Sequence, residues 1–150
     1  MSAARDPAVV GFLCSWCSYA GADKAGLAQR PIPASVRFVR VMCTGRVEPA
    51  FLLEAFRRGA DGVMVLACHP GDCHYKEGNI RSLQRARLLR RLLAPLGVEP
   101  ARLCYDYASA GEDERLAGLA GEFVARLREL GPRRGKSGGG VPPGEDALGG

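Results

Sequence analysis

The sequence is poor in aromatic residues and histidine: aromatic residues make up 7% of its 150 positions, and there are only two histidines. It also has no apolar run of the length that crosses a membrane. The longest stretch without a charged residue runs from Pro7 to Ala22 and is broken by glycine, serine and two cysteines. Neither the basic start nor the apolar stretch of a secretory signal is found around Met1 to Pro7. We therefore predict a cytoplasmic protein that does not insert into a membrane.

The overall charge is positive, with 21 lysine and arginine residues against 16 aspartate and glutamate residues, and the pI is near 9.1. A basic balance of this kind can indicate nucleic-acid binding. However, the densest basic group lies on one predicted helix without the interleaved aromatic residues that stack on bases. This group consists of Arg81, Arg85, Arg87, Arg90 and Arg91. We expect no nucleic-acid partner, and we interpret these arginines as a solvated helix face or as a docking surface for an acidic protein.

Strand-like and helical patterns alternate four times along the chain, which is typical of βα units and a parallel sheet. The predicted strands are Val9–Cys14, Val36–Val41, Gly62–Cys68 and Arg102–Ala108. The predicted helices are Tyr19–Ala28, a segment between Pro49 and Gly59, Ile80–Leu96, and a segment that follows a capping-box spacing at Ser109 and Glu112 and ends at Gly131. These patterns predict an α/β fold with a single open, mostly parallel four-stranded sheet and flanking helices, flavodoxin-like or Rossmann-like in its winding.

The length suits one domain that buries its core without disulfide bonds. We place this α/β domain at residues 9–132, after an N-terminal extension of residues 1–8. From Arg133 onward the composition changes to glycine, proline, serine and scattered charge. Because such a segment cannot bury enough apolar surface to offset the entropy lost on ordering, residues 133–150 are predicted to form a disordered tail.

Five of the six cysteines fall at, or a few residues past, the ends of the first three predicted strands: Cys14, Cys17, Cys43, Cys68 and Cys73. The carboxyl ends of parallel strands share one edge of a sheet, so these thiols can converge although they are far apart in the sequence. In a reducing compartment such a group indicates metal or redox chemistry more than a disulfide framework. The sixth, Cys104, lies inside the fourth predicted strand and is interpreted as a small buried hydrophobic residue.

The spacing of the thiols leaves three kinds of site open. A [2Fe-2S] cluster needs four protein thiolates and accepts them from distant segments. Structural zinc could use Cys14 and Cys17 with Cys68 and Cys73, and His69 and His74 offer nitrogen alternatives, which would make the chain a zinc-stabilised interaction module. The C-x-x-C motif could also be the active site of a dithiol redox protein, but three cysteines at the sheet edge would then have no role.

A resemblance favours the iron–sulfur interpretation. The segments Cys14–Asp23, Arg40–Val47, Gly59–Val63 and Cys68–Tyr75 resemble the delta subunit family of methyl-viologen-reducing hydrogenases. The similarity extends from about Val9 to Pro132, and the string Cys-His-Pro-Gly-Asp-Cys-His-Tyr is distinctive.

The resemblance implies one [2Fe-2S] cluster and an electron-transfer role without bond chemistry of its own. It implies that electrons pass between a hydrogenase or a formate dehydrogenase and the flavin-containing subunit of a heterodisulfide reductase complex. The cysteines of the family fall on Cys14, Cys17, Cys43, Cys68 and Cys73. Four of these five can ligate the cluster: we favour Cys14, Cys17 and Cys43, with Cys68 or Cys73 as the fourth ligand.

Overall fold

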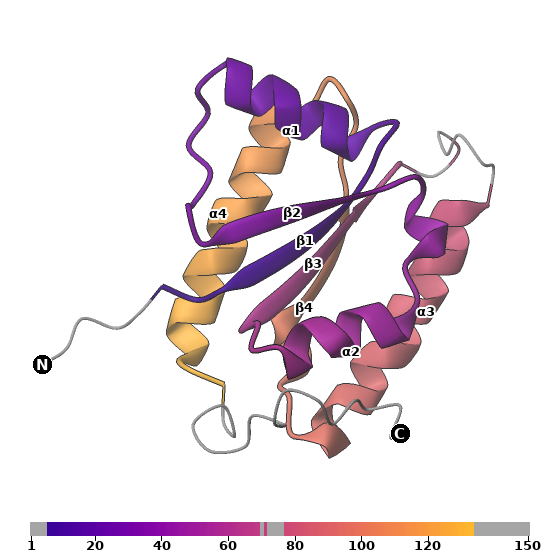
Figure 1. The fold of residues 1–150 in the computed structure, drawn as a ribbon, viewed down its shortest axis with the longest axis vertical. Coiled ribbons are helices and arrows are strands. Elements are labelled where there is room, and N and C mark those ends of the chain that lie inside the picture. Colours follow the sequence, from indigo (N-terminus) through magenta and orange to yellow (C-terminus); the bar gives the residue numbers. More distant parts are fainter. Residues whose placement is uncertain (1–5, 70, 72–76, 134–150) are drawn as a thin grey trace, which may run out of the picture.

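The computed structural model describes residues 6–69, 71 and 77–133. Its strands are β1 (Val9–Cys14), β2 (Val36–Val41), β3 (Gly62–Ala67) and β4 (Leu103–Tyr107). They form one sheet in the order β2-β1-β3-β4, and all three pairings are parallel (Figure 1). The predicted open, parallel four-stranded sheet is confirmed, and its order is that of the flavodoxin-like winding. The predicted tail lies outside the described residues beyond Arg133, as do residues 1–5 of the predicted N-terminal extension.

Helices cover both faces of the sheet. They are α1 (Ser18–Leu27), α2 (Pro49–Arg57), α3 (Gly78–Leu93) and α4 (Asp113–Leu130), and the short 3-10 helices are η1 (Thr44–Arg46), η2 (Ala94–Leu96) and η3 (Pro100–Arg102). Figure 1 shows α1 and α4 together on one side and α2 and α3 on the other. The two successive helices α1 and α2 therefore lie on opposite faces, as expected in a doubly wound sheet.

Two apolar clusters, one on each face, hold the layers together. Along β3 every residue is buried, which explains why this strand shows no alternation of apolar and polar residues. Val63 and Val65 pack toward Leu89 in the cluster that includes α2 and α3. Met64 and Leu66 belong to the opposite cluster, which includes α4. The core is thus split by β1 and β3, the two inner strands of the sheet.

The helix ends follow local chemistry, with one correction to the sequence prediction. Pro49 opens α2, and the left-handed Gly131 (φ 76°) follows α4. The carboxylate of Glu112 accepts a hydrogen bond from the Ser109 backbone N–H at 3.0 Å, which is one half of the predicted capping box. Nevertheless, α4 begins only at Asp113, with Glu112 as its N-cap, and not directly after Ser109.

The predicted helix Ile80–Leu96 both begins and ends earlier than expected, because α3 starts at Gly78. Its α-helical part ends at Leu93 and continues as the 3-10 turn η2. Pro95 lies in that turn, and a proline ring does not fit the interior of an α-helix. Among the described residues no helix is both long and apolar enough to cross a membrane.

Candidate metal centre

Three cysteine thiols meet where the carboxyl ends of β1 and β3 lie side by side. Cys14 is the last residue of β1, Cys17 is the N-cap of α1, and Cys68 directly follows β3. Their Sγ atoms all lie within 4.8 Å of one another, and the Sγ atoms of Cys14 and Cys68 are 3.6 Å apart. All three residues are buried. We call this group the three-thiol site.

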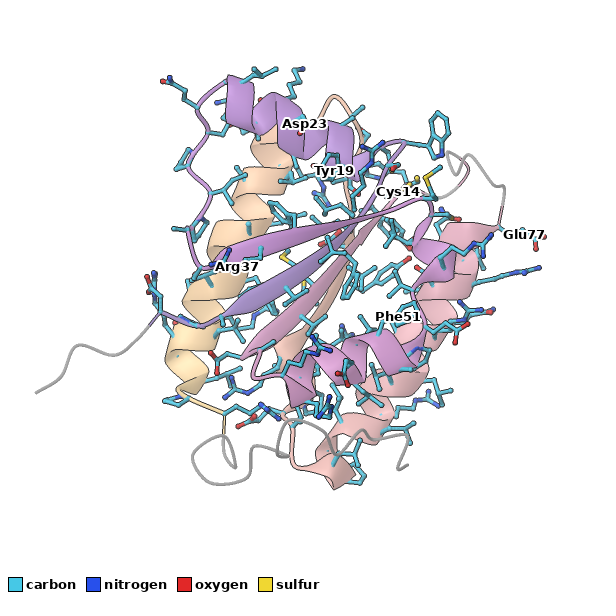
Figure 2. The ribbon with its side chains drawn as sticks, in the orientation of Figure 1. Cys14, Tyr19, Asp23, Arg37, Phe51 and Glu77 are labelled. Atoms are coloured by element: carbon cyan, nitrogen blue, oxygen red, sulfur yellow. The ribbon has the colours of Figure 1, made fainter. Side chains whose placement is uncertain are left out.

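The fold places this site at its topological switch point. The chain leaves β1 toward α1 on one face of the sheet and leaves β3 toward α3 on the other (Figure 1). A crevice forms between two neighbouring parallel strands whose connections diverge in this way, and ligands of open α/β sheets bind there. Figure 2 shows Cys14 at this end of the strands. The three-thiol site therefore occupies the position where this fold builds binding sites.

A serine hydroxyl connects the two strand ends behind the thiols. Ser18 is fully buried in the first turn of α1. Its Oγ accepts a hydrogen bond from the Cys14 backbone N–H at 2.8 Å and donates to the Leu66 carbonyl at 2.7 Å. This bridge fixes the end of β1 against the end of β3 through oxygen and nitrogen atoms alone.

An asparagine on the other face of the sheet fixes the backbone that carries the third thiol. Asn79 is buried in the first turn of α3, and its Nδ2 donates to the carbonyl oxygens of Cys68 and His69, both at 3.1 Å. Neither Ser18 nor Asn79 was predicted from the sequence. The signal they share is a small polar residue in the first turn of the helix that follows a cysteine-bearing loop.

The proximity of the thiols strongly couples their ionisation. Hydrogen bonds from the Cys17 and Cys68 thiols lower the pKa of Cys14 to about 2. The same contact with Cys14 raises the pKa of Cys17 to about 12, and the hydrogen bonds of Cys68 to Cys14 and Cys17 raise the pKa of Cys68. These opposite shifts indicate that the three neighbouring thiols do not all ionise together, because adjacent negative charges repel one another. Such a site suits a cation that replaces the protons.

Cys43 lies at the same edge of the sheet but outside the three-thiol site. It follows β2, is buried and caps η1, and its Sγ accepts a hydrogen bond from the Gly45 backbone N–H at 3.4 Å. The carbonyl oxygen of the preceding residue, Met42, lies 3.8 Å from Sγ of Cys14. The structure thus joins Cys68, rather than Cys43, to the pair Cys14 and Cys17.

The loop that carries Cys43 leaves no room for a larger residue at Gly45. A Cβ atom there would lie 2.8 Å from Cα and 3.1 Å from the carbonyl oxygen of Gly78, at the start of α3. These are backbone atoms, which cannot rotate away as a side chain can. We expect Gly45→Ala to separate η1 from α3 and to lower the free energy of unfolding by about 1–3 kcal/mol. Denaturant unfolding of the purified protein measures this change.

Gly118→Ala is the matched control for this prediction. Gly118 lies within α4, and a Cβ atom added there would meet nothing within 4 Å, so alanine is expected to raise the free energy of unfolding by about 0.5–1 kcal/mol. Equal effects of the two substitutions would contradict the tight contact between η1 and α3.

The remaining predicted site residues are placed as follows. Cys73 and His74 lie outside the described residues. His69 turns toward α4, where its Nε2 contacts the Glu112 carboxylate and lowers the pKa of Glu112, and its ring stacks on Tyr107. Cys104 on β4 packs against the apolar cluster that includes α4, and burial raises its pKa. Neither His69 nor Cys104 belongs to the three-thiol site.

Comparison with known proteins decides the family. The model of the family described as methyl-viologen-reducing hydrogenase, delta subunit, matches residues 9–131. The chain belongs to this family. The resemblance drawn from the sequence is therefore confirmed, and the match includes all the segments on which it rested.

Two kinds of protein are among the relatives of this chain. The chain is 48% identical to the F420-non-reducing hydrogenase iron-sulfur subunit of Archaeoglobus profundus, over 88% of this chain and 96% of that protein. It is 44% identical to the vhc iron-sulfur subunit of an F420-non-reducing hydrogenase from Methanococcus voltae, over 85% and 88%. It is also 44% identical to part of a subunit of the ferredoxin/F420H2-dependent CoB-CoM heterodisulfide reductase of Methanosarcina acetivorans, over 84% of this chain and 16% of that protein. This delta-type domain therefore occurs both as a separate subunit of hydrogenases and as part of a longer heterodisulfide reductase polypeptide.

Proposed function

We propose that this member of the delta subunit family is an electron-transfer subunit whose cysteines hold a [2Fe-2S] cluster. The observation that carries the proposal is the three-thiol site, where the Sγ atoms of Cys14, Cys17 and Cys68 lie within 4.8 Å of one another at the switch point of the sheet. The fourth thiolate comes from Cys43 or Cys73. The names of the hydrogenase relatives, which call those proteins iron-sulfur subunits, support this cofactor class.

The donor set of the site fits such a group. A [2Fe-2S] cluster takes four cysteine thiolates and, when bound, supplies reversible transfer of one electron. The residues of the chain exclude water from the sulfurs and orient them: Ser18 fixes the end of β1, and Asn79 fixes the peptide that carries Cys68. The Gly45 backbone N–H donates toward the Cys43 sulfur, and hydrogen bonds to sulfur raise the reduction potential of such centres.

We further propose that the chain relays electrons from a hydrogenase or a formate dehydrogenase to the flavin-containing subunit of a heterodisulfide-reductase-type complex. The names of the relatives support both ends of this route, since some are hydrogenase subunits and others are subunits of heterodisulfide reductases. In the Methanosarcina proteins the matching segment is covalently part of the reductase polypeptide. A separate chain that does the same work has to bind a protein of that kind directly.

The spacing of two sulfur atoms also fits zinc, which is the second candidate. Zn–S bonds of about 2.3 Å in a tetrahedral site place two sulfur atoms about 3.8 Å apart. The Sγ atoms of Cys14 and Cys68 are 3.6 Å apart, which suits two thiolates on a single ion. In this alternative the chain is an interaction module whose loops are fixed by zinc.

Metal analysis of protein purified without oxygen from its native cells separates the two functions. The proposed function predicts about two iron and two acid-labile sulfide per chain, a brown colour, and a paramagnetic signal that develops on one-electron reduction. A colourless protein with stoichiometric zinc and no sulfide would establish the zinc module instead.

A further inference from the structure

The outward side of α3 combines exposed aliphatic side chains with exposed arginines. Ile80, Leu88 and Leu92 are each about half exposed, at 50%, 56% and 49%, and Leu96 in η2 is 61% exposed. The opposite side of the helix is also apolar and is buried against the sheet. The helix therefore has two apolar sides, one in the core and one exposed. We define the α3 face by its exposed residues: Ile80, Arg81, Gln84, Arg87, Leu88, Arg91, Leu92 and Leu96.

Most of the positive charge of the α3 face has no carboxylate partner in the described part of the chain; Arg81 is the exception, because its guanidinium lies 3.6 Å from the Glu77 carboxylate. The sequence from Gly78 to Val98 contains no aspartate or glutamate. Arg85 and Arg90 are used by the fold, because they donate to the carbonyl oxygens of Gly45 and Leu103. By contrast, Arg87 and Arg91 have no ion-pair partner among residues 6–69, 71 and 77–133.

We propose that the α3 face is a docking surface for another protein whose own surface is apolar at its centre and acidic around it. Contact with such a surface removes the exposed leucines from water and gives Arg87 and Arg91 the carboxylate partners that they lack within the described part of the chain. Arginine is also enriched in protein–protein interfaces, where its planar guanidinium pairs with carboxylates.

Other occupants match the α3 face less well. A second copy of the chain would bring Arg87 and Arg91 against the same arginines. A helix that lies on a membrane keeps its basic residues apart from its apolar face, whereas here leucine and arginine share one face and the other is packed in the core. Nucleic acid is disfavoured because the helix carries no aromatic residue for stacking on bases.

The α3 face begins beside the candidate metal centre. Gly78 and Arg81 at the start of α3 line a cavity of about 720 Å³ together with Cys43. Glu77, the N-cap of α3, projects from the same end of the molecule as Cys14 in Figure 2. A protein bound along the α3 face is therefore adjacent to the thiol edge of the sheet. That this protein exchanges electrons with the chain rests on the proposed function, whereas the docking itself does not.

Site-specific photo-crosslinking tests the docking surface in the native complex. A tagged chain with Leu88→p-benzoylphenylalanine, expressed in its native cells, is irradiated and the cross-linked peptides are sequenced. We expect peptides of a different protein in which aspartate and glutamate surround apolar residues. The matched control is the same replacement at Leu27 on α1, which is 88% exposed and should not cross-link to that protein. Cross-links from position 88 to lipid, to a second copy of the chain or to nothing in an intact complex would overturn the proposal.

Charge reversal gives an independent test with the partner so identified. We expect Arg87→Glu/Arg91→Glu to weaken its dissociation constant by at least about tenfold, with metal content and thermal midpoint unchanged. Arg37→Glu/Arg126→Glu changes the net charge equally at exposed positions on β2 and α4 and should bind as the unmodified chain does. Equal weakening by both pairs would overturn the proposal. If the purified protein contains zinc in place of iron, the proposed function is wrong. If Arg87→Glu/Arg91→Glu still weakens binding in that case, the docking surface stands.

Discussion

Cys68→Ala is expected to give a folded protein that contains no iron. Cys68 supplies one of the three sulfurs that lie within 4.8 Å of one another, and a cluster that loses one of its four thiolates has no full ligand set. Its side chain is small and only one of many contacts at the end of β3, so the fold should persist. Iron and acid-labile sulfide are measured after anaerobic purification, and circular dichroism shows whether the secondary structure is retained.

Cys104→Ala is the control for this substitution, because Cys104 is a partly buried cysteine of β4 that packs against the apolar core outside the three-thiol site. It should keep its iron. Between Cys43→Ala and Cys73→Ala, one is expected to lose the iron and the other to keep it, which identifies the fourth ligand. A dithiol redox protein would behave differently: Cys14→Ala and Cys17→Ala would abolish its activity, and Cys68→Ala would not. Full iron content in Cys68→Ala would contradict the proposed ligand set.

Arg102→Met is expected to lower the free energy of unfolding by about 2–5 kcal/mol. The Arg102 side chain is completely buried just before β4. Its guanidinium donates to the carbonyl oxygens of Asp61 and Gly131, at 3.1 and 2.8 Å, and to the Glu99 carboxylate at 2.6 Å. Methionine fills much of the same volume but donates no hydrogen bond, so three hydrogen bonds are lost at the end of the sheet opposite the thiols.

Denaturant unfolding of the purified protein measures this loss. Arg126→Met, at an exposed position of α4, is the matched control and should change the free energy of unfolding by less than about 0.5 kcal/mol. Arg102→Lys keeps the charge but not the fork of donors, so an intermediate loss is expected. A loss below about 1 kcal/mol in Arg102→Met would show that water or neighbouring groups replace the guanidinium without strain.

Much of the fold was predictable because its local signals agree with its tertiary contacts. The uninterrupted apolar run of β3 has the pattern of a strand covered on both faces, and the structure buries all of it. Pro49 and Gly131 mark helix ends that the structure confirms. The predicted start of α4 was wrong, because Glu112 is the N-cap and not a residue of the first turn. Its carboxylate accepts from the Ser109 N–H and also contacts His69, and the local sequence does not show the second contact.

The grouping of the thiols was predictable only in part. Their presence at one edge follows from the parallel strands, but which of them touch depends on the length of each loop after its strand. Cys14 and Cys68 lie at strand ends that are neighbours in the sheet, whereas Cys43 lies beyond Met42 and caps η1. Sequence spacing does not fix that difference of one or two residues. Ser18 and Asn79 were missed because their partners are backbone groups outside their own helices, which the residue type alone does not identify.

The Ser18 bridge has a consequence for how the protein is assembled in the cell. The Ser18 hydroxyl, the Asn79 amide and the paired strands fix the backbone around Cys14 and Cys68 without using any sulfur atom. The polypeptide can therefore complete its folding first, unlike a zinc finger, whose structure depends on its ion. The proposed cluster would then be inserted into a site that is already folded, and a chain without its cofactor would not be exposed to degradation as unfolded protein.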